Sequence, residues 1–255
     1  MRKFILTAIL TVGLVLGVGL ASYAATIDLT GTVRDFTPQT NSDFQANIGG
    51  FAPNMVLTTL GLDGKPVFNT TASAPGNSSS TAATFYSWYH SGAPSKNVTI
   101  TLNETFPGSG IYRYANNAFF PIDNELLGNY PGYSHNYHFT FEIHTTFTYD
   151  SSKNMNFNFT GDDDVWVFIN GQRVIDLGGI HSALSASVAL NSLGLSDGQT
   201  YDFDFFFAER HTTESNLMIE TSIPLNSNPV PIPAAFWLFG SSLVGLAGLR
   251  KKFKK

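Results

Sequence analysis

Apolar side chains occupy every second position in several stretches of the chain. The longest stretch runs from Tyr137 to Tyr149, and shorter ones cover residues 27–36, 155–159, 201–207 and 217–223. Because successive side chains of a β-strand point to opposite faces of the sheet, this alternation predicts strands that each bury one face.

A hairpin is predicted near the middle of the chain. Val165 to Ile169 form a continuous apolar run, Asn170 and Gly171 follow, and residues 173–177 form the expected return strand. The pair Asn-Gly suits a two-residue type I′ turn, because both central residues of that turn need a positive φ. Trp166 lies inside the first of these strands and is expected in the core.

The regular spacing of the strands defines the fold class. Between residues 25 and 228 we find no helical period of useful length. Short strands separated by turns rich in Gly, Asn and Asp are typical of an antiparallel sandwich. We therefore expect an all-β fold, an antiparallel and jelly-roll-like β-sandwich, with a signal helix before it and a membrane helix after it.

The first segment, residues 1–24, is typical of a secretory signal peptide. Arg2 and Lys3 precede an apolar run from Phe4 to Leu20, and small residues at Ser22 and Ala24 suit cleavage after Ala24. The alternative is a retained membrane anchor. Export through the Sec pathway is the predicted consequence.

The last segment, residues 229–255, combines a Pro-rich start, an apolar run from Ala234 to Leu249 and the basic tail RKKFKK. A free-standing membrane helix needs about 20 apolar residues, so this run is short for one. The sequence VPIPAAFWLFGS (230–241) resembles the PEP-CTERM sorting signal of Gram-negative bacteria. That resemblance implies processing by an exosortase and transient anchoring in the inner membrane; a plain C-terminal anchor is the alternative.

Composition and charge exclude several functional classes. The absence of Cys excludes disulfide scaffolds, thiolate metal sites and Cys nucleophiles. The net charge is −5, but seven of the 14 basic residues lie in the two terminal segments, which leaves seven against all 19 acidic residues in 25–228. A nucleic-acid partner is therefore not expected. An acidic middle suits divalent cations, or simply solubility.

The most unusual polar motif is the run Asp162, Asp163 and Asp164 between two predicted strands. Neighbouring carboxylates repel one another unless a hard cation lies between them. Because Gly161 permits a sharp turn before them, the three carboxylates are candidate metal ligands. A solvated acidic turn is the alternative interpretation.

Two further polar groups follow predicted strands, where a site at the edge of the sheet would lie. They supply five candidate ligand-binding residues: Asp176, His181, Glu209, Arg210 and His211. The alternative for Glu209 and Arg210 is a local ion pair, and the two histidines have structural or surface roles as their alternative.

These polar motifs carry a family resemblance. The stretches GDDDVWVFING (161–171), VIDLGGIH (174–181) and FFFAERH (205–211) closely resemble the fibro-slime domain, a relative of the protective-antigen-type β-sandwich of flocculins, adhesins and some glycosidases. The resemblance covers residues 137–223 and extends back to Ile27. It identifies residues 25–228 as one domain of this type.

The resemblance implies carbohydrate binding, often with calcium held by an Asp-Asp pair joined by an unusual peptide bond. Alignment places that pair at Asp162 and Asp163. Asp164 stands where many members have glycine, so the sequence leaves open which two of the three bind calcium. Trp88 and its neighbours Tyr86, Tyr89 and His90 are expected to offer an aromatic platform for sugars.

Three functions remain in competition. The first is a calcium-assisted module that binds an extracellular polysaccharide at the cell surface or in the matrix. The second is a structural matrix protein without a discrete ligand. The third is a glycoside hydrolase using Asp163 and Glu209, since such an enzyme needs two carboxylates about 5 to 10 Å apart. We expect the first, and no enzymatic activity, because relatives that are enzymes usually carry catalysis in a separate domain.

Overall fold

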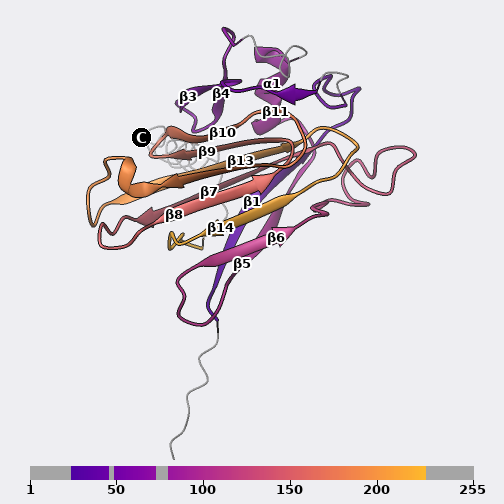
Figure 1. The fold of residues 1–255 in the computed structure, drawn as a ribbon. Helices are drawn as coiled ribbons and strands as arrows, with labels where there is room; N and C mark the ends of the chain where they lie inside the picture. The colour runs from indigo at the N-terminus through magenta and orange to yellow at the C-terminus, as the bar shows by residue number, and fades with distance from the viewer. Residues whose placement is uncertain (1–23, 46–48, 73–79, 228–255) are drawn as a thin grey trace, which may run out of the picture.

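The computed structural model describes residues 24–45, 49–72 and 80–227 (Figure 1). In this part of the chain almost every regular element is a strand, and each pairing between named strands is antiparallel. The strands are β1 (Thr26–Asp35), β2 (Gly50–Phe51), β3 (Val56–Leu60), β4 (Pro66–Phe68), β5 (Ser95–Glu104), β6 (Tyr112–Asn116), β7 (Phe139–Thr148), β8 (Asn156–Gly161), β9 (Asp164–Ile169), β10 (Gln172–Leu177), β11 (Gly179–Ile180), β12 (Leu184–Ala189), β13 (Thr200–Glu209) and β14 (Leu217–Thr221). The helices are α1 (Ala82–Tyr89) and the short 3₁₀ helix η2 (Leu190–Ser192).

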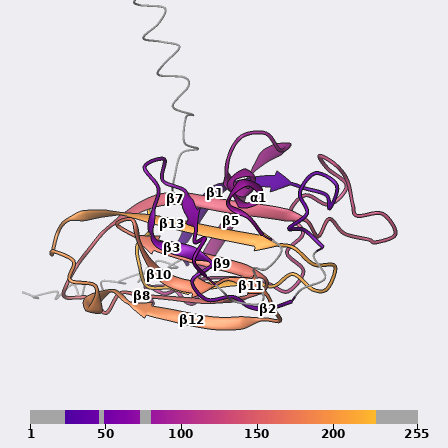
Figure 2. The ribbon, with the colours of Figure 1, turned by 90° about the horizontal axis from the view of Figure 1, so that it is seen from above.

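The main sheet of the described residues has 12 strands in the order β12-β8-β14-β6-β5-β1-β7-β13-β9-β10-β3-β4. The sheet curls over, so that β12 at one end comes to lie beside β10 near the other. Figure 2 shows β12 and β8 on one side of the molecule and β1 and β7 on the other. The predicted all-β antiparallel fold is confirmed, and its two facing layers are halves of one continuous curled sheet.

The inner faces of the two layers form the larger core. Rings from β8 meet rings from β13: Phe157 lies 5.0 Å from Phe203, and Phe159 lies 5.6 Å from Phe205. These residues are the ones whose alternation predicted the strands. On β7 the same alternation buries Phe139, Phe141, Ile143 and Phe147. The period of two therefore correctly predicted which side chains form this core.

A second, smaller core covers the outer face of the sheet. It joins aromatic side chains of α1 to Trp166, Phe168 and Phe206 on β9 and β13. Because both faces of these two strands are covered, their side chains are buried without interruption from Val165 to Ile169. The prediction that Trp166 lies in the core is confirmed, since the side chain is fully buried.

The helix α1 is an element that the sequence analysis missed. Thr81 caps its first turn, and the side chains of Thr81 and Thr84 each accept a hydrogen bond from the other's backbone N–H. The helix turns Trp88 and Tyr89 inward, where both are buried. The expected sugar platform at these residues is therefore wrong; in this group only Tyr86 is largely exposed, at 59%, and it stacks on His90.

The predicted hairpin is confirmed. Asn170 and Gly171 join β9 to β10 with φ values of 53° and 70°, as a type I′ turn requires. The predicted strand at residues 27–36 is β1, and the one at residues 217–223 begins with β14.

The predicted signal helix (residues 1–24) and membrane helix (within 229–255) fall almost wholly outside the described residues. Among the residues that the structure describes, none belongs to a helix with the length and hydropathy needed to cross a membrane.

Strand register brings several strand ends together at one end of the sheet. Asp35 pairs with Phe139, Ala208 with Asp164, and Leu217 with Gly161. The segments that leave these strand ends form what we call the loop rim: residues 36–45, 117–138, 162–163, 178–183 and 210–216. The loop rim contains five of the predicted site residues: Asp162, Asp163, His181, Arg210 and His211.

Candidate functional site

Asp162 and Asp163 connect β8 to β9 in the loop rim, and the peptide bond between them is cis. Because β14 pairs with β8, Asn216 lies next to Asp162. The Asn216 backbone N–H donates to Asp162 Oδ1 (2.5 Å) and its side-chain amide donates to Oδ2 (2.8 Å). Burial raises the pKa of Asp162, although these two hydrogen bonds act in the opposite direction.

Asp163 is buried between two backbone donors. The N–H of His181 donates to its Oδ1 (3.0 Å), and the N–H of Arg210 donates to its Oδ2 (3.2 Å). Burial, followed by the nearby negative charge of Asp164, raises the pKa of Asp163 to about 8. This environment therefore favours the protonated form of the Asp163 carboxyl group.

Asp164 has a different partner, the side chain of Arg210. Arg210 Nε lies 2.6 Å from Asp164 Oδ2 and Nη2 lies 3.1 Å from Oδ1, so the guanidinium grips the carboxylate at both oxygens. The two side chains are completely buried. The guanidinium also lies 4.9 Å from the ring of Trp88. This pair joins the loop rim to the smaller core.

Glu209 ends β13 beside these acids and is 1% exposed. Its Oε1 accepts a hydrogen bond from the N–H of His211 (3.2 Å), whereas its buried Oε2 has no hydrogen-bond partner among the described residues. Burial, and then the charges of Asp163 and Asp162, raise the pKa of Glu209 well above its usual range. Glu209 thus lies close to Asp162 and Asp163 at this end of the sheet; we call these three carboxyl groups the acid cluster.

Three predicted binding residues remain: His211 donates its backbone N–H to Glu209, and the other two have structural contacts. Asp176 accepts hydrogen bonds from the N–H of Asn54 (2.7 Å) and from the indole of Trp166 (3.1 Å). It also forms an ion pair with Arg173. His181 lies at the edge of the acid cluster, but its ring nitrogens face the backbone oxygens of residues 182 and 177.

The structure does not gather the three consecutive aspartates around one point. Within residues 24–45, 49–72 and 80–227, no three His, Asp or Glu side chains are arranged to hold a metal ion. The reason is that each aspartate already accepts hydrogen bonds from a different partner: Asn216, two backbone amides, or Arg210. The residue that the sequence analysis missed is Asn216, because only the register of β14 against β8 brings it to Asp162.

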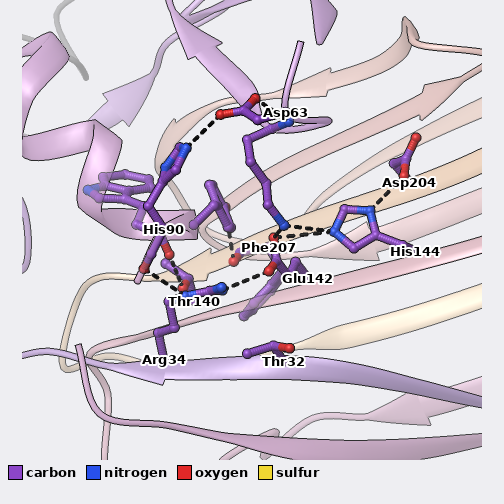
Figure 3. A network of polar contacts seen from close by, with 12 residues as sticks. Thr32, Arg34, Asp63, His90, Thr140, Glu142, His144, Asp204 and Phe207 are labelled. Carbon is purple, nitrogen blue, oxygen red and sulfur yellow. Dashed lines mark hydrogen bonds and ion pairs between the residues drawn. The ribbon is translucent and has the colours of Figure 1, made fainter. Parts of the chain in front are cut away.

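A second polar cluster lies on the outer face of the sheet (Figure 3). Glu142 on β7, 3% exposed, contacts Arg34 of β1 (2.9 Å) and Lys65 from the β3–β4 turn (2.7 Å). Lys65 also lies 3.0 Å from Nε2 of His144, whose Nδ1 lies 2.7 Å from Asp204. We call these residues the Glu142 network. The contact between Lys65 and Glu142 holds the β3–β4 turn against the sheet.

The pKa values of the half-buried His144 and the buried His138 are expected to lie on opposite sides of the usual value for histidine. Burial disfavours the charged form of His144, but hydrogen bonds to Asp204 and Glu142 outweigh it and raise the pKa above 6.5. Burial and the nearby His211 lower the pKa of His138 to about 4. Histidine NMR resonances followed from pH 3 to pH 9 measure both midpoints, and exposed histidine behaviour at either site would contradict the contacts described.

Comparison with known proteins identifies related sequences. The model of the PA14 domain family matches residues 108–231. The Dictyostelium discoideum proteins psiQ and psiC are 43% and 40% identical to the chain, over 78% and 85% of its length. The chain spans only 21% of psiQ and 45% of psiC.

Solved structures show a distant similarity. The PA14 domain of the antifreeze protein MpAFP is 11% identical, covers 82% of this chain and 86% of its own, and gives a TM-score of 0.36. A GH31 alpha-xylosidase from Xanthomonas citri is 12% identical, covers 73% of this chain and 16% of its own, and gives a TM-score of 0.27.

These comparisons correct the family resemblance drawn from the sequence. The matching model is that of the PA14 domain, and neither the fibro-slime domain nor the PEP-CTERM signal is found. The match runs on to residue 231, into the segment interpreted as a sorting signal, and the similar psi proteins come from Dictyostelium, not from Gram-negative bacteria. Residues 108–231 thus match the PA14 domain family, and over most of its length the chain is similar to the psi proteins.

Proposed function

We propose that this chain is a non-catalytic carbohydrate-binding module of an exported or cell-surface protein, and that calcium at the loop rim assists binding. The observation that carries the proposal is the acid cluster, where burial raises the pKa of all three carboxyl groups and the charges of Asp163 and Asp162 raise that of Glu209 further. A cluster of this kind is unfavourable on its own and becomes favourable when a divalent cation offsets the repulsion.

The donor set fits a hard cation. Asp162 and Asp163 supply carboxylate oxygens, which calcium prefers. The Asn216 amide, 2.8 Å from Asp162, would supply a third oxygen after rotation by 180°, because the two ends of an amide have nearly the same shape. These three residues would hold the ion. Calcium held there would supply a positive charge that attracts sugar hydroxyl oxygens.

One observation supports a binding role without catalysis, and a second supports export. Glu209 is almost completely buried, and Asp163 is 4% exposed, so neither carboxyl group faces an open cleft where a sugar would be cleaved. The basic and apolar pattern of residues 1–24 supports export. The purely structural alternative predicts a stable domain that binds no glycan.

Calcium binding is expected to depend on Asp163. Calcium at 100 times its Kd should stabilise the wild-type chain by about 2.7 kcal/mol. Asp163→Asn should abolish this shift, because Asn mimics the protonated acid and removes a negative ligand. In chelator at pH 8 or above the same variant should be at least as stable as wild type. The pKa of Asp163 is higher in the folded state than in the unfolded state, so the wild-type chain loses stability as the pH rises towards 8.

The measurement is thermal unfolding with and without calcium, followed by a glycan array in both buffers. Asp202→Asn is the matched control, because Asp202 is an exposed residue on β13 and the charge change is identical. An equal calcium shift in Asp163→Asn and wild type, or no shift in either, would contradict the metal site. A calcium shift with no glycan bound would favour the structural role.

A further inference from the structure

A pocket of about 290 Å³ lies in the loop rim, between the end of β1 and the segment that leads into β7. We call it the loop pocket. Phe36, Tyr130 and His138 supply rings to its lining, and Gln39 and Asn136 supply amides. None of its lining residues belongs to the acid cluster. Its volume is at the small end of the range of ligand sites, which is about 300–1,000 Å³.

Hydrogen bonds hold the walls of the loop pocket in place. Asp35, buried behind it, accepts from the N–H of Leu127 (2.8 Å) and from the amide of Asn136 (2.9 Å). The Asn136 amide also donates to the backbone oxygen of Gly128 (3.0 Å). His138 Nε2 lies 3.1 Å from Gln45 Oε1. The pocket is therefore formed before any ligand enters, which reduces the entropic cost of binding.

The lining carries no charge at neutral pH. It contains no Asp, Glu, Lys or Arg side chain. His138 is the only titratable group of the lining apart from the Tyr130 hydroxyl, and burial together with His211 lowers the pKa of His138 to about 4. An ionic ligand would lose its hydration without gaining an opposite charge, so the lining favours an uncharged ligand.

Two polar groups of the lining have no hydrogen-bond partner among the described residues. Neither the Gln39 amide nor the Tyr130 hydroxyl makes a side-chain hydrogen bond to the described residues. The Tyr130 ring is half-buried and is held edge-to-face against His138, with centroids 4.6 Å apart. An aromatic ring beside free amide and hydroxyl groups suits a ligand with one apolar face and several hydroxyls.

We propose that the loop pocket binds one uncharged sugar ring, with its apolar face on Tyr130 and its hydroxyls on Gln39. This inference rests on the proposed carbohydrate-binding function and adds a subsite that does not require calcium. The small volume limits the site to a single ring of a longer glycan, and the neutral lining discriminates against acidic sugars.

The test is a ligand-observed NMR titration of the full chain, in calcium and in chelator. The probes are the methyl glycosides of glucose, galactose and mannose, N-acetylglucosamine, and the acidic sugar N-acetylneuraminic acid. At least one neutral probe should bind equally in both buffers and the acidic probe should not bind. Tyr130→Ala should weaken binding by about tenfold or more, because it removes the stacking face.

Two further variants make the result decisive. Gln39→Trp introduces a large ring at an exposed residue of the pocket lining and should block binding. This variant tests the pocket even if the Tyr130→Ala variant does not fold. Tyr86→Ala removes an exposed tyrosine of α1, outside the lining, and should leave binding unchanged. Binding that survives both Tyr130→Ala and Gln39→Trp, or no neutral probe bound in chelator, would overturn the loop pocket.

The acid cluster separates this proposal from the proposed function. Asp163→Asn should leave sugar binding in the loop pocket intact while removing the calcium response. Sugar binding that is lost in Asp163→Asn and in chelator, but kept in Tyr130→Ala, would overturn the loop pocket and leave the calcium site standing.

Discussion

Replacing Arg210 by leucine is expected to lower the free energy of unfolding by about 3–5 kcal/mol, because it leaves the carboxylate of Asp164 buried without its partner. Both side chains are fully buried, and the guanidinium holds both carboxylate oxygens. The leucine also loses the contact of the guanidinium with the ring of Trp88.

Urea unfolding at pH 7 measures this loss. Lys96→Ala is the control, because Lys96 forms an exposed ion pair with Glu125, and such pairs contribute about 0–1 kcal/mol. The double variant Asp164→Asn with Arg210→Leu should recover part of the stability by removing the buried charge. An Arg210→Leu variant as stable as Lys96→Ala would contradict the buried pair.

Replacing Glu142 by glutamine should cost about 3 kcal/mol at pH 7. Burial of Glu142 opposes ionisation, but the hydrogen bond from His144 and the charges of Arg34 and Lys65 prevail and lower its pKa from 4.5 to about 2. At about 1.4 kcal/mol per pKa unit, this difference gives the expected loss. Because the folded-state pKa is depressed, the stabilisation is present above pH 4.5 and disappears as the pH falls to 2.

Urea unfolding at a series of pH values from 7 to 2 tests this expectation. The wild-type chain should lose stability steeply below pH 4.5, and Glu142→Gln should start lower and lose less. Glu125→Gln is the matched control, because the exposed side chain of Glu125 has just the surface pair with Lys96 among the described residues. Parallel pH profiles for wild type and Glu142→Gln would show that the Glu142 network does not set the acid stability.

The sequence predicted the strands well, because their alternation is a local property. It predicted the burial of Phe139 and Phe205 on the inner face, but not that of Phe206, which points to the opposite face. That side chain is covered by Tyr89 of α1, whose ring lies 5.0 Å away. The helix was missed because its eight residues are aromatic on the side that packs, with no clear helical period.

The candidate site was predicted only in part. The acids of the 162–164 run were proposed as ligands of one ion, yet these neighbours in sequence have different partners in space. Asp164 accepts a hydrogen bond from Arg210, and Asp162 accepts one from Asn216, which is 54 residues away in the sequence. Such partners follow from strand register, which no single stretch of sequence reveals. The loop pocket was missed for the same reason, since its walls come from two distant segments.

The described chain begins and finishes on the same side of the sheet. Ser227 Oγ accepts a hydrogen bond from the N–H of Asp28, and Asn226 contacts Thr146 at the far end of β7. Along β1, about 23 Å of extended backbone separates Asp28 from Asp35 beside the loop rim. In a longer polypeptide, neighbouring parts would therefore attach at the end of the sheet opposite the acid cluster and the loop pocket. Both sites would then face away from the point of attachment.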